Sequence, residues 1–471
     1  MSRLVCVSNR VSLPKRGAAP GGLAVGVLAA MRDAGGLWFG WGGEITHDEP
    51  GDADVLIRDG VTYATIELRR RDFDPYYNGY ANGTLWPLCH YLLSGFHFSD
   101  EQYDAYQRVN RLFAQKLAPL LKPDDVIWVH DYHLVPLAER LRDLGVTNPI
   151  GFFLHIPFPH IEMLRILPTH AELLREMTAY DVAGFQTEND MRAFHSGVHT
   201  VWGPDTVSVD NRVTIGARTM HTGVFPIGID VAGVENAAAQ GAQSEAVRRL
   251  QASLLGRKLM IGVDRLDYSK GLIERVAAYT RFLETYPDNL GNITFMQVAP
   301  LSRTNVRAYA EIRKALEQAA GRINGRFADA DWTPIRYLNK NIPHEALMGY
   351  LRAAQVALVT PARDGMNLVA KEFVAAQDPS DPGVLILSPL AGAARELVGA
   401  IQVNPYDSRG LAHAMQTALS MPLAERRDRH ASMMDVIRRN DVVAWHHRFV
   451  TALHNATQRP AGSPRLEVAN G

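Results

Sequence analysis

The sequence is poor in cysteine, almost neutral, and free of long apolar runs. Its 471 residues include two cysteines, Cys6 and Cys89, which give neither a disulfide framework nor a cysteine zinc pattern and are typical of a reducing cytosol. The formal net charge of -1 argues against a broad nucleic-acid surface, so any phosphate must be bound locally. No apolar run approaches about 18 residues, and the N-terminus lacks the apolar stretch of a signal peptide. We therefore expect a cytoplasmic protein with no membrane span and no nucleic-acid partner.

Motifs that mark several other enzyme classes are also missing. The chain has no GxxxxGK(S/T) phosphate loop, no GxSxG nucleophile elbow and no HExxH zinc motif. Residues 9–22 do not fit the GxGxxG dinucleotide pattern, which disfavours a dehydrogenase. His130, Asp131 and His133 stand close together, but further ligands at a defined spacing are missing. We therefore expect no cofactor and no obligatory metal.

What the sequence does contain is a repeated alternation of short apolar segments with helix-spaced segments. The apolar segments have the length of buried strands and lie at residues 4–8, 126–129, 150–154, 181–185, 259–263, 293–299, 335–338, 356–360 and 384–387. This alternation predicts parallel sheets with helices on both faces. It breaks at Phe225–Asp230 and then restarts. We therefore predict an α/β fold of two doubly wound, Rossmann-like domains facing across a cleft, residues 1–229 and 230–440, with a disordered tail at 458–471.

The first half also carries several local predictions. Residues 23–34 are expected to form a helix, 38–43 a compact aromatic turn, 58–70 a strand pair and 74–87 a functional loop. Ser99 with Gln102 matches a capping box, and Thr187 with Asp190 matches a helix cap. In doubly wound sheets ligands bind beyond the carboxyl ends of the strands, so the polar residues at those ends are candidates for a site.

Residues 356–372, VALVTPARDGMNLVAKE, combine a strand, a tight turn containing Gly365, and a helix from Leu368 onward. This arrangement directs backbone N–H groups at an anion, and the glycine lets a ligand approach the backbone closely. Asp364 and Glu372 add acceptors for sugar hydroxyls, which a phosphate-only site would not need. The segment therefore predicts a site for a sugar joined to a diphosphate; the alternative is an ordinary strand-to-helix turn.

The segment 264–271, DRLDYSKG, also follows a strand and opens a helix. Arg265 offers a planar fork of donors and Lys270 a point charge, so the pair can hold a diphosphate and stabilise it as it leaves. The alternative is a solvated helix start with a surface ion pair. Gly21 and Gly22 precede a predicted helix and can bring backbone N–H groups to the same diphosphate.

The remaining candidates suit a phosphorylated acceptor. Arg10 and Arg303 each follow a strand end and can bind a second phosphate; the alternative is an ordinary surface arginine. Tyr77 and Trp86 offer an aromatic face to a sugar ring; the alternative is a hydrophobic plug beneath a loop. His155 also follows a strand end, where it either contacts a sugar or belongs to the core.

A series of motifs, in order along the chain, resembles the trehalose-6-phosphate synthase family. They are SNR (8–10), GGLAVG (21–26), GLWFGW (36–41), YYNGY (76–80), LWP (85–87), VHDYH (129–133), GFFLHIPFP (151–159), VDRLDYSKG (263–271), TPARDGMNLVAKE (360–372), NPYD (404–407) and NDVVAWHHRF (440–449). This family consists of retaining, two-domain GT-B enzymes that transfer glucose from UDP-glucose to glucose 6-phosphate. The resemblance implies this fold and activity, a homo-oligomer, often a tetramer, and a last helix at about 441–457 that crosses back to the first domain.

The resemblance also implies roles for individual residues. Acceptor glucose 6-phosphate would be bound by Arg10, Tyr77, Trp86, Asp131 and Arg303. Donor UDP-glucose would be bound by Gly21, Gly22, Arg265, Lys270, Ile342, Asp364, Gly365, Met366, Asn367, Leu368, Val369, Ala370, Lys371 and Glu372. The residues closest to the reaction would be Asp131, His155, Arg265, Lys270 and Asp364.

Two features depart from the family pattern. The loop between Arg10 and Gly21 is short, and Ile342 stands where some relatives carry an aromatic residue near the base pocket, which leaves the donor nucleotide open. Two alternatives to this activity are a related transferase with another phosphorylated acceptor, such as glycerol 3-phosphate, and a non-catalytic regulatory subunit of trehalose synthesis. A regulatory subunit should have lost charged contacts, yet the charged candidates are all present.

Overall fold

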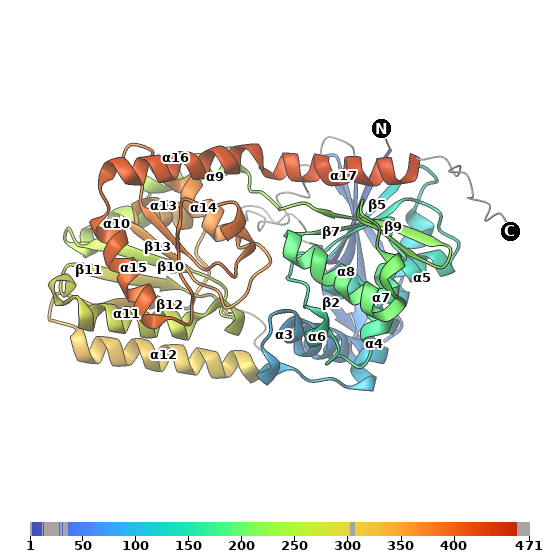
Figure 1. Ribbon diagram of the computed structural model, residues 1–471, viewed down its shortest axis with the longest axis horizontal. Helices are drawn as coiled ribbons and strands as arrows, with labels where there is room; N and C mark the ends of the chain where they lie inside the picture. Colours follow the sequence, from blue (N-terminus) through green and yellow to red (C-terminus); the bar gives the residue numbers. More distant parts are fainter. Residues whose placement is uncertain are drawn as a thin grey trace, which may run out of the picture.

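The structure is a computed structural model that describes residues 2–11, 13, 28, 31, 36–301 and 307–458. Two lobes lie side by side, and each is built on one sheet with helices on its faces (Figure 1). Within the described residues, the strand order is β3-β4-β2-β1-β5-β6-β7-β9-β8 in the first lobe and β12-β11-β10-β13-β14-β15 in the second. The predicted α/β fold with two doubly wound lobes is therefore confirmed.

The sheet of the first lobe is parallel at its centre and antiparallel at both edges. β1 pairs in parallel with β5, and β5 with β6, whereas β3–β4 and β8–β9 are hairpins. β5 and β6 are buried along their whole length, because helices cover both faces of a parallel sheet. The strands are β1 (Leu4–Arg10), β2 (Leu37–Thr46), β3 (Asp54–Arg58), β4 (Val61–Arg69), β5 (Val126–His130), β6 (Ile150–Phe153), β7 (Val182–Phe185), β8 (Arg212–Ile215) and β9 (Arg218–Val224).

The helices of the first lobe pack on this sheet through one apolar face each. In α4, the buried residues Tyr106, Val109, Phe113 and Leu117 recur at helical spacing. The helical segments are α2 (Arg70–Phe73), the π-helix η1 (Asp74–Leu85), α3 (Trp86–Cys89), η2 (Leu93–Gly95), α4 (Asp100–Leu117), η3 (Ala118–Leu120), η4 (Tyr132–Leu134), α5 (Leu137–Asp143), α6 (Ile161–Leu164), α7 (His170–Met177), α8 (Glu188–Trp202) and η5 (Pro204–Thr206).

The second lobe carries a sheet whose described strand pairs are all parallel. Its strands are β10 (Lys258–Val263), β11 (Ile293–Val298), β12 (Ile335–Leu338), β13 (Val356–Val359), β14 (Val384–Leu387) and β15 (Ile401–Gln402). Its helical segments are α9 (Val231–Ala242), α10 (Glu245–Leu254), η6 (Tyr268–Lys270), α11 (Leu272–Thr285), η7 (Pro287–Asn289), α12 (Arg307–Phe327), α13 (His344–Ala353), α14 (Leu368–Ala376), η8 (Gly392–Arg395), α15 (Ser408–Ser420) and α16 (Leu423–Arg439).

The last helix, α17 (Val442–Gln458), lies on the first lobe although it follows α16 of the second (Figure 1). Trp128 of β5 stacks on Phe449 at 4.7 Å and packs against Trp445 at 4.8 Å between ring centroids. A β-carbon at Gly151 of β6 would lie 2.7 Å from the Phe449 ring, so a glycine at this position lets α17 pack closely on the sheet. We propose the boundary between the lobes at residues 229 and 230, with α17 as part of the first.

The predicted aromatic turn at 38–43 is wrong, because these residues lie within β2. They pair in parallel with both β1 and β4, and Trp38, Phe39 and Trp41 are buried. A β-carbon at Gly40 would lie 2.1 Å from the carbonyl oxygen of Ser8. The glycine therefore permits close packing against β1 rather than a chain reversal.

The predicted loop at 74–87 is also wrong, because η1 and α3 make it helical. Tyr76 and Tyr80 are fully buried, and the Tyr80 ring lies 4.6 Å from that of Tyr106 in α4. Burial of these rings outweighs the low helix propensity of the Asn and Gly residues between them. The strand pair expected at 58–70 is displaced: β3 begins at Asp54, and the reversal lies at Asp59 and Gly60, both at positive φ.

Of the two predicted caps, one is confirmed. The Thr187 hydroxyl oxygen accepts a hydrogen bond from the Asp190 N–H at the start of α8. Ser99 is the N-cap residue of α4, but its side chain accepts no capping hydrogen bond, so the capping box with Gln102 is wrong. The predicted helix at 23–34 lies outside the described residues except for Leu28 and Met31, and the tail lies outside them from residue 459 onward.

Candidate active site

The loop between β13 and α14 forms the edge of the second lobe that touches the first. Asn367 has a left-handed backbone (φ 75°), which turns the chain into α14. The first N–H groups of α14 have no partner within the helix and point away from its N-terminus. A β-carbon at Gly365 would lie 2.0 Å from the carbonyl oxygen of His155 in the first lobe. Because only glycine fits this gap, the backbones of the two lobes are in contact at this point.

Asp364, beside that glycine, is paired with Lys270. The lysine Nζ lies 2.5 Å from the aspartate Oδ2, and both side chains are mostly buried. The Asn367 amide donates a second hydrogen bond to the same oxygen at 3.0 Å. Two of the residues predicted to bind donor are therefore brought together by the fold from strand ends far apart in sequence.

Two carboxylates of the 264–271 segment have structural partners. Asp264 accepts a hydrogen bond from Arg275 at 2.7 Å, and both are buried. Asp267 accepts from the backbone and hydroxyl of Ser269. These contacts hold the turn and leave Arg265 as the exposed side chain, with its guanidinium 5.8 Å from the centre of the Trp86 ring across the cleft.

Asp131 follows β5 in an unusual conformation. Its φ of 77° lies in the region that favours glycine, so its backbone is strained. The neighbouring strand holds it, because its N–H donates to the carbonyl of Phe153 and its Oδ1 accepts from the N–H of His155 at 3.2 Å. Backbone strain of this kind is concentrated at functional sites, which favours the predicted role of Asp131.

His155 lies beneath this turn, with its Nε2 3.1 Å from Nδ1 of His130. Burial lowers the pKa of His155 to about 3 and also lowers that of His130 well below its usual range. The two imidazoles are therefore neutral at physiological pH, and one can donate to the other. A neutral His155 can act as a hydrogen-bonding group but not as a charged acid.

The predicted acceptor residues are placed around the end of the first sheet. The Tyr77 ring stacks between Phe73 at 5.4 Å and His133 at 5.7 Å, so its orientation is fixed by both. The Trp86 ring is buried against His90 at 4.1 Å. The exposed Arg10 guanidinium lies 5.3 Å from the centre of the Trp41 ring.

The remaining predicted donor residues lie on α14, just before it, or before α13. Leu368 and Val369 in its first turn are half-buried, as is Ile342 before α13, whereas Met366 and Ala370 are buried. Burial raises the pKa of Glu372 to about 7. The Lys371 side chain does not reach the cleft: its Nζ contacts the Ile227 carbonyl and the Glu396 carboxylate.

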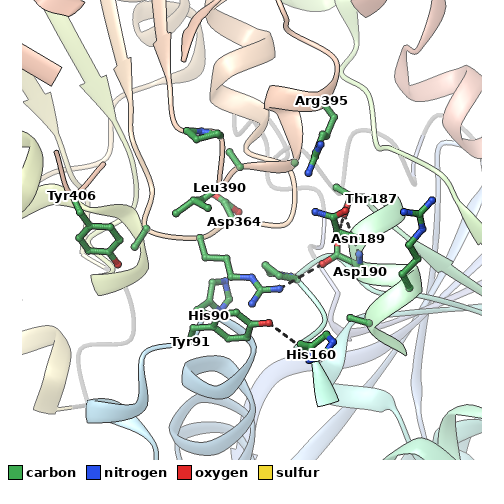
Figure 2. Close-up of a pocket in the computed structure, with 18 residues that line it drawn as sticks. His90, Tyr91, His160, Thr187, Asn189, Asp190, Asp364, Leu390, Arg395 and Tyr406 are labelled. Atoms are coloured by element: carbon green, nitrogen blue, oxygen red, sulfur yellow. Dashed lines mark hydrogen bonds and ion pairs between the residues drawn. The ribbon is translucent and has the colours of Figure 1, made fainter. Parts of the chain in front are cut away.

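A cavity of about 690 Å³ opens between the lobes beside Asp364 (Figure 2). Its volume is that of a typical small-molecule site. Among the described residues that line this cavity, Asp364 is the one that was predicted as a site residue. The first-lobe wall consists of His90, Tyr91, Pro157, His160, Thr187, Asn189, Asp190, Arg192 and Ala193, and the second-lobe wall of Ala362, Arg363, Asp364, Pro389, Leu390, Ala391, Gly392, Arg395 and Tyr406.

Arg363 is the cavity residue that joins the lobes most directly. Its Nη2 donates to the Phe158 carbonyl at 2.9 Å, and its guanidinium lies 3.7 Å from the centre of the Tyr91 ring. Its position beside Asp364 is visible in the sequence, but nothing local indicates Tyr91 or Phe158 as partners. The sequence therefore places Arg363 within the predicted 356–372 segment but does not reveal its role between the lobes.

Three predicted residues, Gly21, Gly22 and Arg303, lie outside the described residues. Within the described chain, no three histidine, cysteine, aspartate or glutamate side chains converge as a metal-binding group would require. None of its helices has the length and apolarity needed to cross a bilayer.

Comparison with known proteins points to the same family as the sequence motifs, over nearly the whole chain. A family model described as Glycosyltransferase family 20 matches residues 12–455. Trehalose-6-phosphate synthase of Cronobacter sakazakii is 49% identical over 471 residues, covering 100% of this chain and 98% of that protein.

Solved structures agree in fold. An alpha,alpha-trehalose-phosphate synthase (UDP-forming) from Burkholderia xenovorans in complex with glucose-6-phosphate has a TM-score of 0.92 at 47% identity, covering 96% of this chain and 100% of that one. An E. coli structure bound with UDP-2-fluoro glucose has a TM-score of 0.92 at 48% identity, covering 96% and 99%. With sequence and fold in agreement over nearly its full length, this chain belongs to glycosyltransferase family 20.

Proposed function

We propose that this protein transfers glucose from UDP-glucose to glucose 6-phosphate with retention, giving α,α-trehalose 6-phosphate and UDP. The observation that carries the proposal is the meeting of the Asp364–Gly365 turn with His155 across the two lobes, with Lys270 paired to Asp364. The full-length similarity to trehalose-6-phosphate synthases, among them structures with glucose-6-phosphate and with UDP-2-fluoro glucose, supports these substrates.

On the donor side, Arg265, Lys270 and the N-terminus of α14 bind the diphosphate. A cation, a guanidinium and helix N–H groups are the usual partners of such an anion. Asp364 and the 365–367 backbone bind the glucose hydroxyls, and Glu372 accepts hydrogen bonds from the ribose. Lys270 is already held by Asp364, so the diphosphate shares this lysine with the carboxylate that orients the sugar.

On the acceptor side, Arg10, Tyr77 and Arg303 bind the phosphate of glucose 6-phosphate, and Trp86 and Asp131 bind its sugar. Tyr77 and Trp86 are both held by contacts with neighbouring rings, so they present a preorganised surface. The contact of Arg265 with the Trp86 ring brings the donor and acceptor groups to one place in the cleft.

The reaction follows front-face substitution at the glucose C1. The bond from C1 to the phosphate oxygen breaks, and the acceptor C1 hydroxyl forms the new bond on the same face. Its proton passes to the departing phosphate oxygen of UDP, so no protein base is required. Cations fixed around the leaving diphosphate stabilise the charge that develops there, which is commonly the largest contribution to such catalysis.

The test is a donor panel of UDP-, ADP- and GDP-glucose with glucose 6-phosphate, read by product mass and anomeric NMR. An α,α-linked phosphodisaccharide formed fastest from UDP-glucose is the expected result. Glycerol 3-phosphate in place of glucose 6-phosphate tests the related-transferase alternative. Donor binding without release of UDP would instead favour a regulatory subunit.

Three finer features belong to the same proposal. The protein is cytoplasmic, in keeping with its two unpaired cysteines, Cys6 and Cys89. It forms a homotetramer, which light scattering of the purified chain measures. It needs no metal, so turnover should be unchanged after treatment with EDTA.

A further inference from the structure

In the part of the chain that the structure describes, two crossings between the lobes touch each other. The first crossing runs through residues 225–230, and the second is the junction of α16 and α17 at Asn440 and Asp441. A β-carbon at Gly228 would lie 2.1 Å from the carbonyl oxygen of Asn440, and the Val442 N–H donates to the Ile229 carbonyl. Because both crossings are in backbone contact, they form a single hinge.

One residue of this hinge, Ile227, is held by both lobes through its backbone. Its N–H donates to the side-chain oxygen of Gln186, which follows β7 in the first lobe, at 3.0 Å. Its carbonyl accepts from Nζ of Lys371, on α14 in the second lobe, at 2.7 Å. A rotation of one lobe relative to the other would therefore change the hydrogen bonds of the Ile227 backbone.

Lys371 also joins the second crossing through a buried ion pair. Its Nζ lies 2.6 Å from Oε2 of Glu396, and these side chains are 1% and 11% exposed. The other oxygen of Glu396 accepts from the Asn440 amide at 2.9 Å. Burial lowers the pKa of Lys371 while Glu396 opposes that shift, so the ammonium depends on these partners. Both crossings are thus tied to one side chain.

We propose that Lys371 is a positioning residue that transmits occupancy of the donor site to the orientation of the lobes. The helix that carries it, α14, also carries Leu368, Val369 and Glu372, so the donor contacts and the hinge contact lie within about one helical turn. A helix moves as a rigid unit, so a donor that fixes the first turn of α14 also fixes the hinge. The inference rests on the proposed function, because it needs a donor at α14.

The test compares UDP-dependent lobe closure and catalysis in the wild type and in K371M, which keeps the apolar stem and removes the charge. Dyes on V209C in the first lobe and L255C in the second, both highly exposed, report the distance between lobes by energy transfer. The native cysteines are buried and react slowly with dyes. R438M, which removes an exposed Arg438–Glu235 pair within the second lobe, is the matched control.

We expect UDP to change energy transfer in the wild type and in R438M but not in K371M. In K371M, kcat should fall by at least about tenfold, the size of a moderate coupling between sites, while KM for UDP-glucose changes far less. K371R, which keeps the charge, should recover part of both signals. Equal energy-transfer changes and equal kcat in K371M and the wild type would overturn the proposal.

A second variant guards against simple misfolding. K371M/E396L removes both charges of the buried pair, a replacement that is often well tolerated. We expect it to fold and still to lack the UDP response. If it regains the response and kcat, the pair has only a structural role and the proposal fails. Closure on UDP without transfer to glucose 6-phosphate would reject the proposed acceptor while supporting the coupling.

Discussion

Nζ of Lys270 and Oδ2 of Asp364 lie 2.5 Å apart, although the two residues follow different strands of the second lobe. The pair places a cation next to the carboxylate expected to hold the donor sugar. We predict that K270A lowers kcat by about two orders of magnitude, as loss of one preorganised charge-stabilising donor does. Steady-state kinetics at saturating UDP-glucose measure this. K258A, which removes a surface lysine of the same lobe, is the control and should be nearly normal.

Gly365 gives a steric prediction. A β-carbon there would lie 2.0 Å from the His155 carbonyl oxygen, which belongs to the backbone and cannot move aside cheaply. We expect G365A to hold the lobes apart and to lower kcat/KM at least about a hundredfold, as misplacement of reacting groups by an ångström can do. The melting temperature should stay close to that of the wild type.

G325A is the matched control for this variant. Gly325 lies within α12, and a β-carbon there meets nothing within 4 Å. Alanine should be neutral or stabilise the helix by about 0.5–1 kcal/mol. Full activity in G365A would contradict a tight contact between the lobes during turnover.

Glu372 predicts a pH dependence of donor binding. Burial raises the pKa of its carboxyl to about 7. If the ionised form accepts hydrogen bonds from the ribose, UDP binding releases a proton below this pH. The affinity for UDP should therefore fall as the pH decreases below 7, by up to about tenfold per pH unit, and be level above it. Calorimetry between pH 5 and 9 measures this, and E372Q should abolish the slope; a slope retained in E372Q would exclude this carboxyl as its source.

For His155 we predict no contribution to the pH dependence of turnover. Because burial lowers its pKa to about 3, the imidazole stays neutral throughout pH 5–8. H155N should lower kcat by roughly threefold to tenfold, which is the loss of one hydrogen bond, while the shape of the pH–rate profile stays the same. A limb near pH 6.5 that disappears in H155N would show that the histidine titrates during turnover.

For Arg275 we predict an effect on the stability of the second lobe rather than on catalysis. It is fully buried and donates to Asp264 and to the Gln297 side chain, so removing its charge leaves Asp264 unpaired in the core. R275M should destabilise the second lobe by about 3–5 kcal/mol, seen as a lower melting temperature by calorimetry. R281M on the same helix, whose arginine is only half-buried, should have a much smaller effect; similar losses in both variants would mean that the buried pair contributes little.

The local sequence predicted β10 to β14 of the second lobe within one residue at each end, but it missed β15. β13, the turn at Gly365 and α14 follow from an apolar β-branched run, a glycine and a series of helix formers, all of which act over a few residues. Prediction failed where tertiary packing outweighed local preference. Residues 38–43 look like a turn because of their glycines, yet neighbouring strands on both sides extend them into β2.

The same division applies to the candidate site. Strand ends could be recognised from the sequence, so Asp131, His155, Arg265 and Asp364 were placed at the correct edges of their sheets. Their partners could not be recognised. Nothing near Asp264 in the sequence reveals that Arg275 neutralises it and leaves Arg265 to face the cleft.

By itself the sequence determined the alternation of elements, the order of the motifs and the family, because these depend on short patterns read along the chain. Only the tertiary structure decided that Lys371 faces the hinge rather than the donor cleft, and that Gly365 touches His155. Each of these contacts joins groups far apart in sequence. Their proximity is set by how two sheets and their covering helices pack, which no local pattern encodes.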